Sequence, residues 1–532
     1  MKKESKIDYA LMIPALILTL AISLPLALFK EQGADIVNKV FAFTTSNFKW
    51  AFLIFGLFCV LFLIWLGCSK YGKIKLGGPD DKPEFSTYTW AAMIFCAGIG
   101  IAIVYWAFIE PVYYMGGPPF GIEKNSTLAA EWAGALGQFH WGITPWAIYA
   151  LPTFPIAYAI HVKKIPALKL STACKGIIGK KADGALGKVI DIIVIFAMVG
   201  GVGTSLGLAV PLVTTLVASV LGIQESMTLQ LIVLGVSTAV IAGTVWSGLQ
   251  KGMAALSNLN TYVAYFLLLF VFLLGPTIYI LNLWTNSLGI LFTNFFRLSL
   301  GTDPVANGGF PEAWTVFYWA WWIAYAPMMG LFVARISKGR TIREVVFGEL
   351  VFGSVGCWIF FAIWGGYAIH IQTTGILDVA TIVGKVGTGG TIVAILETLP
   401  AGKWLVLPAI KAGKWFVLPA FIALCVIFLA TTINSAAFTL SSQVTKEITG
   451  DEEPPRVNRT LWAVLLGVFA LGLLLAGGLT AVQLSSVVAA LPLIPILILM
   501  VLSLMKWLKE DYKDILSSGE VTLTEDKIKP VE

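Results

Sequence analysis

The sequence has little charge. Only 12% of its 532 residues are Asp, Glu, Lys or Arg, and 58% are hydrophobic, whereas a soluble domain has roughly 25% charged residues. A chain so poor in charge cannot cover the surface of a soluble protein of this length, so a soluble enzyme is excluded. The net charge of +6 is small, and it does not indicate a nucleic-acid partner.

Clusters that would hold a metal or a catalytic pair are also missing. The three histidines, His140, His161 and His370, are scattered, and no acid lies close to a second acid or base inside an apolar run. The six cysteines have no C-x-x-C spacing, which favours reduced thiols over a disulfide framework; they are Cys59, Cys68, Cys96, Cys174, Cys357 and Cys425. A membrane enzyme and a bound cofactor are therefore not expected.

The sequence contains many long apolar runs. Segments of about 20 residues, long enough to cross a bilayer core as a helix, recur along the chain and predict an all-α polytopic membrane protein. The twelve predicted transmembrane helices are 9–29, 50–67, 88–112, 139–161, 187–220, 227–247, 258–284, 313–336, 344–370, 414–444, 458–479 and 484–507. Segment 286–300 is short and amphipathic, so we expect it to lie along the membrane interface.

Basic residues concentrate in alternate loops, and such loops face the cytoplasm. The basic residues are Lys2, Lys3, Lys6, Lys70, Lys73, Lys75, Lys163, Lys164, Lys169, Lys175, Lys180, Lys181, Arg335, Lys338, Arg340, Arg343, Lys446, Arg456 and Arg459. This pattern predicts a multi-pass protein of the cytoplasmic membrane with both termini in the cytoplasm. A local duplication, AGKWLVLPAIK (401–411) followed by AGKWFVLPAF (412–421), is expected on the outer side, and its role is not predicted.

The third predicted span has two glycines in mid-membrane. Gly98 and Gly100 lie in the stretch AGIGIA (97–102), and each glycine weakens a helix by roughly 1 kcal/mol relative to alanine. An unwound helix exposes carbonyl oxygens, which transporters use to bind ions near the membrane midplane. Close helix packing is the alternative, because Gly98 and Ala102 form a small-xxx-small pair.

Aromatic residues form a stripe in the eighth predicted span. WTVFYWAWWIAYAPMM (314–329) contains no acid or base, and six of its residues share one helical face; they are Trp314, Tyr318, Trp321, Trp322, Tyr325 and Met329. An aromatic belt at the membrane interface would explain the outermost, Trp314. Trp321, Trp322 and Tyr325 lie too deep for a belt, although core packing remains an alternative for them.

A second aromatic set, FHWGITPWAIY (139–149), contributes Trp141, Trp146 and Tyr149. Two such sets on different spans suit a quaternary ammonium group, which has no N–H to donate to a carboxylate. A ring face attracts this cation by roughly 0.5–2 kcal/mol per desolvated contact. The sequence thus favours a transporter of such compounds, although a channel or a sensor is not excluded by these residues alone.

Several stretches together resemble the betaine/choline/carnitine transporter family: AGIGIA, FHWGITPW, TDPVANGGFP (302–311), the tryptophan-rich eighth span, and ARISKGRTIRE after it. The resemblance, from about residue 10 to 507, implies two inverted five-helix repeats with a LeuT-like core in a homotrimer. The implied divisions are an N-terminal tail with two peripheral helices (1–87), the first repeat (88–285), an interfacial helix and connector (286–312), the second repeat (313–507) and a short cytoplasmic tail (508–532).

The resemblance also implies the site residues. The central substrate box becomes Trp141, Trp146, Tyr149, Trp321, Trp322 and Tyr325. Tyr113 or Tyr114 would act as a lid, and Trp314 matches a position that holds a second, outer substrate in the exchangers. In sodium-coupled relatives the ion would be held by carbonyls of Cys96, Ile99 and Phe428 and hydroxyls of Thr431 and Thr432.

Two coupling mechanisms are compatible with the sequence: sodium symport and substrate/product antiport. Sodium-independent exchangers of the family carry an arginine where this chain has Asn260. The absence of that positive charge favours sodium symport. Met329 matches an exchanger methionine that stands in for a second sodium ion, which favours substrate/product antiport. Thr431 and Thr432 could also simply bond their own helix backbone. The expected function is import of a glycine betaine, carnitine, butyrobetaine or choline type of compound, by sodium symport or alternatively by antiport. Ala102 argues against choline as the substrate. Choline has no carboxylate of its own, and a carboxylate side chain at this position would be expected to accompany such a substrate.

Overall fold

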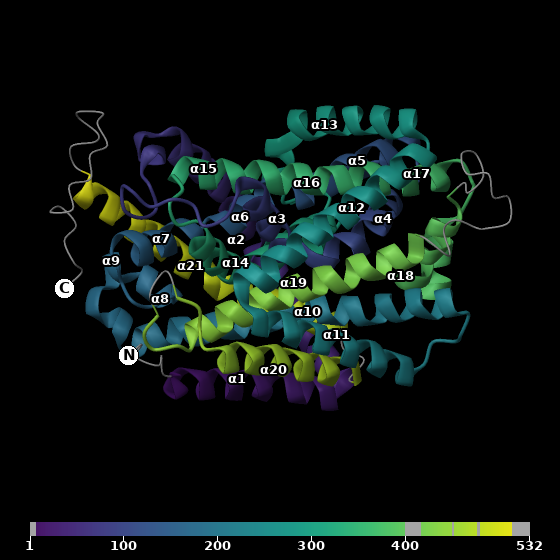
Figure 1. Cartoon of the computed structure of the whole chain (residues 1–532). Helices are drawn as coiled ribbons and strands as arrows, with labels where there is room; N and C mark the ends of the chain where they lie inside the picture. The colour runs from purple at the N-terminus through teal and green to yellow at the C-terminus, as the bar shows by residue number, and fades with distance from the viewer. Residues whose placement is uncertain (1–6, 400–416, 449–451, 476–478, 513–532) are drawn as a thin grey trace.

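The computed structural model describes residues 7–399, 417–448, 452–475 and 479–512. These residues form helices without a named strand; two isolated β-bridges join Ile7 to Thr445 and Lys75 to Thr341. The axes of most of the long helices are roughly aligned, and the start of α1 and the end of α21 lie at the same end of the bundle (Figure 1). The duplication at 401–421 falls mostly outside the described residues.

The first half of the chain forms the following elements: α1 (Tyr9–Leu28), α2 (Lys30–Cys68), η1 (Lys70–Lys73), α3 (Thr87–Gly98), α4 (Gly100–Gly116), α5 (Thr127–Trp141), α6 (Ile143–Ala150), α7 (Thr153–Ala157), η2 (Tyr158–Val162), α8 (Leu170–Ala173), α9 (Lys175–Ile178), η3 (Gly179–Asp183), α10 (Ala185–Leu221), α11 (Met227–Gly248), η4 (Leu249–Met253) and α12 (Ala254–Leu274). Segments α5 to η2 together make one long apolar stretch, Thr127–Val162.

The second half forms these elements: α13 (Thr277–Leu300), η5 (Pro311–Val316), α14 (Phe317–Ile336), α15 (Ile342–Phe347), η6 (Gly348–Phe352), α16 (Gly353–Phe360), η7 (Phe361–Gly365), α17 (Gly366–Thr373), α18 (Val379–Glu397), α19 (Leu418–Gln443), α20 (Arg456–Leu475) and α21 (Leu479–Asp511). Short π-helical turns interrupt the span that runs from α15 to α17.

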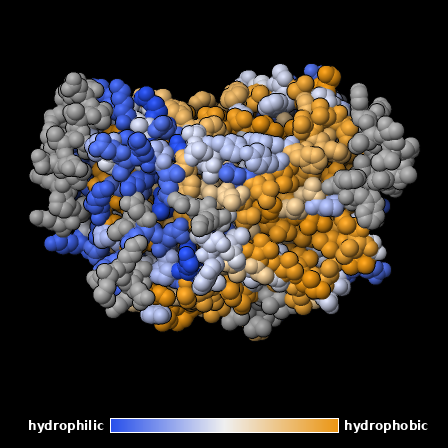
Figure 2. All heavy atoms as spheres, viewed as in Figure 1, coloured by the Kyte–Doolittle hydropathy of each residue, from blue (hydrophilic) through white to orange (hydrophobic). Residues whose placement is uncertain are grey.

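The apolar helices are those of a membrane protein. Among the described residues, ten helices are long and apolar enough to cross a bilayer, and the bent pair α3/α4 makes an eleventh. Hydrophilic residues gather at the end of the bundle that carries the termini, while hydrophobic residues cover most of the remaining visible face (Figure 2). The predicted all-helical, polytopic membrane fold is confirmed; the count of twelve spans and the two inverted repeats remain predictions.

The structure departs from several predicted helix ends, since the span predicted at 258–284 ends at Leu274 and the span predicted at 50–67 is part of α2 (Lys30–Cys68), and it departs more clearly in two further elements. Helix α18 (Val379–Glu397) was not predicted, although it is long and apolar enough to span a membrane. Its sequence TIVGKVGTGG (381–390) contains four glycines and a lysine, typical of a loop, and Gly387 has a φ of 68° that kinks the helix. The amphipathic segment expected at 286–300 is the second part of a longer helix, α13, which starts at Thr277 and packs against α5.

Candidate functional site

The centre of the site is a break in the third predicted span. Helices α3 and α4 meet at a 67° bend, and Gly100 has a φ of 52°, a left-handed conformation that favours glycine. A Cβ on Gly100 would lie 2.2 Å from Thr432 Oγ1. A Cβ on Gly98 would lie 3.0 Å from Met329 Cε. Gly100 therefore has the backbone conformation of the break, and Gly98 lies where a neighbouring side chain packs closely; ion binding at the break stays a prediction.

The two aromatic sets meet beside this break. The ring centroid of Trp322 lies 4.9 Å from that of Trp141, 5.1 Å from that of Trp321 and 5.5 Å from that of Tyr149. Trp146 lies 5.8 Å from Tyr149. The cluster of six residues, which we call the aromatic box, is Trp141, Trp146, Tyr149, Trp321, Trp322 and Tyr325; all six are buried. No charged residue is among them, so the box presents ring faces rather than ionic groups.

Hydrogen bonds fix the orientation of the box residues. The Trp322 Nε1–H donates to the His140 carbonyl at 3.1 Å. The Tyr149 hydroxyl donates to the Gly98 carbonyl at 3.1 Å, which ties the box to the broken helix. The Tyr325 hydroxyl is bonded to that of Ser205 on α10. The polar atoms of these three rings thus bond to groups outside the box, and the rings contact one another.

A buried carboxyl group, which the sequence analysis missed, adjoins the box. Glu110 on α4 is fully buried and accepts hydrogen bonds from the Tyr114 hydroxyl, from the Tyr318 hydroxyl at 2.5 Å and from Trp141 Nε1 at 2.9 Å. The Tyr114 hydroxyl also lies 2.6 Å from His140 Nδ1. The signal was present in the sequence, because an acid in the middle of an apolar span marks a functional site by default.

The residues expected outside the box lie toward η5. Trp314 is partly buried, and its ring centroid is 4.6 Å from that of Tyr114 and 6.3 Å from that of Tyr318. Tyr114 is fully buried and belongs to the Glu110 network, whereas Tyr113 is 37% exposed. Trp314 thus contacts Tyr114 and Tyr318, which connect it to the Glu110 network.

The expected ion ligands also come together. The hydroxyls of Thr431 and Thr432 on α19 lie 3.4 and 3.3 Å from the Cys96 carbonyl oxygen on α3. Thr431 also donates to its own helix at Phe428 O, 2.9 Å away, as the alternative for this residue supposed. Ile99 lies at the break itself, directly after α3. Asn260 on α12 is buried, with its Nδ2 3.7 Å from Cys96 Sγ.

Three acids, Asp191, Glu312 and Glu349, lie near the ends of predicted spans, where the sequence predicts that an acid is ion-paired or solvated; the structure places them in three different surroundings. Glu312 pairs with Lys49 at 2.5 Å, as expected. Asp191 is buried and accepts hydrogen bonds from the backbone N–H and hydroxyl of Ser171 instead of facing solvent. For Glu349 the expectation was wrong: it is fully buried, and neither carboxyl oxygen has a hydrogen-bond partner within the described part of the chain.

The site thus combines a bundle of apolar helices, a broken helix and a buried cluster of aromatic side chains. The sequence matches the model of the betaine/carnitine/choline transporter family over residues 10–513, and the chain belongs to that family. It is therefore an integral membrane transporter rather than an enzyme.

The similarity to a solved structure is weaker evidence than the family match. A sodium-coupled sialic acid symporter, solved in a substrate-bound, outward-open state, aligns with 87% of this chain and 92% of its own, at 12% identity and a TM-score of 0.42. At this level the likeness adds nothing to the assignment of substrate or ion.

Proposed function

We propose that this transporter imports a quaternary-ammonium compound of the glycine betaine, carnitine, butyrobetaine or choline type across the cytoplasmic membrane, and that the aromatic box binds it. The observation that carries the proposal is the meeting of two uncharged aromatic sets, 141–149 and 321–325, beside the broken helix. Several ring faces around one trimethylammonium group each contribute roughly 0.5–2 kcal/mol when desolvated.

Sodium is the proposed coupling ion. The Cys96 carbonyl and the hydroxyls of Thr431 and Thr432 converge from α3 and α19, and neutral oxygen ligands of this kind suit a hard cation. The carbonyls of Ile99 and Phe428 would complete the set. Asn260, beside Cys96, brings no positive charge that would replace the ion. Sodium bridging α3 and α19 would favour the outward-open state before substrate closes the box.

Sodium-independent antiport is the second candidate. It is favoured by Met329, whose Cε lies so close to Gly98 that only a glycine fits there without a shift. A thioether at the unwound segment would occupy part of the space that a second cation would need. For a zwitterionic substrate, symport with one sodium would be electrogenic, while exchange of two zwitterions would be electroneutral.

The proposal includes the wider organisation that the family implies. Spans three to seven and eight to twelve would form two inverted repeats, three copies would form a homotrimer, and both termini would lie in the cytoplasm. The gathering of hydrophilic residues at the end that carries the termini supports this orientation (Figure 2).

Uptake into proteoliposomes tests the function. Labelled glycine betaine and carnitine would be offered with and without an inward sodium gradient, and with and without unlabelled substrate inside. We expect sodium-dependent accumulation in empty vesicles. Uptake that ignores sodium but needs internal substrate would establish antiport, and no saturable uptake of any quaternary amine would refute the substrate class.

A further inference from the structure

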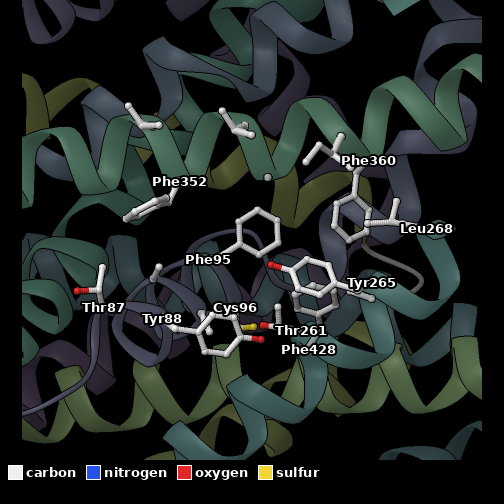
Figure 3. Close-up of a pocket in the computed structure, with 17 residues that line it drawn as sticks. Thr87, Tyr88, Phe95, Cys96, Thr261, Tyr265, Leu268, Phe352, Phe360 and Phe428 are labelled. Carbon is white, nitrogen blue, oxygen red and sulfur yellow. The ribbon is translucent and has the colours of Figure 1, made fainter. Parts of the chain in front are cut away.

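A second cavity lies outside the aromatic box, on a flank of the bundle. It has a volume of about 440 Å³ and lies between α3, α12, the η6–α16 segment and α19 (Figure 3). This volume is within the range of small-molecule sites, roughly 300–1,000 Å³. Thr87 lies at one end of the cavity and Leu268 at the other, with the Phe95 ring between them (Figure 3).

The mouth of the cavity opens toward the membrane. Three of its lining side chains are strongly exposed: Tyr265 on α12 (55%), Phe352 on η6 (45%) and Tyr88 on α3 (41%). All three belong to segments that cross the bilayer by length and composition. Exposed aromatic side chains on such segments are suited to contact lipid tails, so we place this opening against the hydrocarbon of the bilayer.

The lining matches a hydrocarbon chain and does not match an ion or a polar solute. None of its residues is charged, and most are aromatic, aliphatic, alanine or glycine. An apolar cavity of this kind does not retain water, because a buried water needs two to four polar partners. The hydroxyl group of Thr87 lies at the end where α3 begins, next to Arg340, whose Nη1 is 3.5 Å from Thr87 Oγ1.

The wall of the cavity is shared with the transport site. Phe95 stacks on Trp146 of the aromatic box, with ring centroids 6.2 Å apart and planes 12° apart. Its neighbour Cys96, which also lines the cavity, offers its carbonyl to Thr431 and Thr432. Whatever fills this cavity therefore touches the helix that carries both the break and the proposed ion ligands.

We propose that the cavity binds one acyl chain of a bilayer phospholipid, with its glycerol end at Thr87 and its methyl end toward Leu268. The bound chain supports Phe95 from behind and holds it against Trp146. The site is a lipid site, distinct from the substrate box.

Photo-labelling in liposomes tests the proposal. The purified full-length protein would be reconstituted with phosphatidylcholine that carries a diazirine at the end of one acyl chain, then irradiated, digested and mapped by mass spectrometry. We expect concentrated labelling of 351–360 and of 264–268. Ala264→Phe places a ring inside the cavity, since Ala264 lines it and is 4% exposed, and should abolish that labelling. The matched control, Ala239→Phe on the exposed face of α11, should retain it.

Labelling of these peptides that is equal in the wild type and in Ala264→Phe would overturn the proposal. So would displacement of the label by saturating glycine betaine or carnitine, because the cavity would then be part of the substrate path. If Ala264→Phe does not fold, Val355→Trp at the 40% exposed mouth serves in its place. The readout requires no transport, so its failure and a failure of the proposed function are distinguishable.

Discussion

At the scale of single residues, Trp322 contacts most of the other box residues. Its Nε1–H is bonded to the His140 carbonyl, and its ring meets Trp141, Trp321 and Tyr149. Trp322→Ala should raise the substrate concentration for half-maximal uptake by about 10-fold or more, since one desolvated cation–π contact contributes up to about 2 kcal/mol. Transport kinetics in proteoliposomes would measure this. Trp246→Ala on the exposed face of α11 is the control, and wild-type affinity in Trp322→Ala would refute the box.

The two threonines of the proposed ion site should contribute unequally. Thr431 divides its hydroxyl between the Cys96 carbonyl and its own helix, while Thr432 Oγ1 contacts Cys96 O at 3.3 Å and lies against Gly100. Thr432→Ala should therefore raise the sodium concentration for half-maximal transport more than Thr431→Ala does. Thr439→Ala removes a hydroxyl that bonds only within α19 and should leave sodium dependence unchanged. A sodium response unaltered in the Thr431→Ala/Thr432→Ala double variant would remove both residues from the site.

Two buried acids should respond in opposite ways to the same substitution. Glu349 has no hydrogen-bond partner for either oxygen within the described residues, whereas Glu110 accepts from three donors. Burying an unsatisfied polar group costs about 1–3 kcal/mol. Glu349→Met should raise the thermal unfolding temperature in detergent, and Glu110→Met should lower it by leaving donors unpaired. A lower unfolding temperature in Glu349→Met would show that the carboxyl group has a stabilising partner.

Side chains whose role follows from their spacing along a helix are predictable from the sequence. Side chains whose role depends on partners distant in the sequence are not. The stripe from Trp314 to Met329 follows directly from helical periodicity, and the structure brings it together with Trp141, Trp146 and Tyr149. Glu110 itself stands out in the sequence as an acid inside an apolar span, but two of its three donors come from 31 and 208 residues away. No local pattern encodes such a network.

At the scale of elements, the broken helix is encoded by one glycine. Gly100 combines a φ of 52° with a Cβ position 2.2 Å from Thr432 Oγ1. Gly100→Ala should therefore abolish transport and lower stability, since a left-handed conformation costs a non-glycine residue about 1–2 kcal/mol before the clash is counted. Gly116→Ala, at the end of the same helix with nothing within 4 Å of its Cβ, is the control. Uptake and thermal unfolding measure both effects, and active Gly100→Ala would show that the break is dispensable.

The helices were predictable where the apolar run is long, even with glycines inside it, and not where closely spaced glycines and a lysine fill a short segment. The predicted span 187–220 agrees with α10 (Ala185–Leu221) to within two residues at each end. Helix α18 was missed because its glycines and Lys385 have the composition of a loop, and only its packing against α4 and α10 stabilises it as a helix. Tertiary contacts thus decide an element whose local composition is that of a loop.

At the scale of the whole molecule, ion pairs join segments that are remote in sequence at the hydrophilic end of the bundle. Asp511, the last residue of α21, lies 2.7 Å from Lys163 Nζ and 2.5 Å from the Tyr158 hydroxyl. The side chains of Lys163 and Asp511 are only 3% and 5% exposed. The first long apolar stretch after the broken helix is therefore anchored to α21.

Asp511→Ala should destabilise the protein by about 3–5 kcal/mol, because it leaves the Lys163 ammonium buried without its partner. Lys163→Met together with Asp511→Leu should recover most of that loss, since replacing a buried ion pair by apolar residues is often neutral or stabilising. Thermal unfolding in detergent, with Lys39→Ala in the exposed Lys39–Asp35 pair as control, measures both. Because an exposed pair contributes only about 0–1 kcal/mol, the control should differ little from the wild type. If Asp511→Ala unfolds at the wild-type temperature, the pair does not anchor α21, and the packing of α21 against α10 and α14 alone holds the last helix in place.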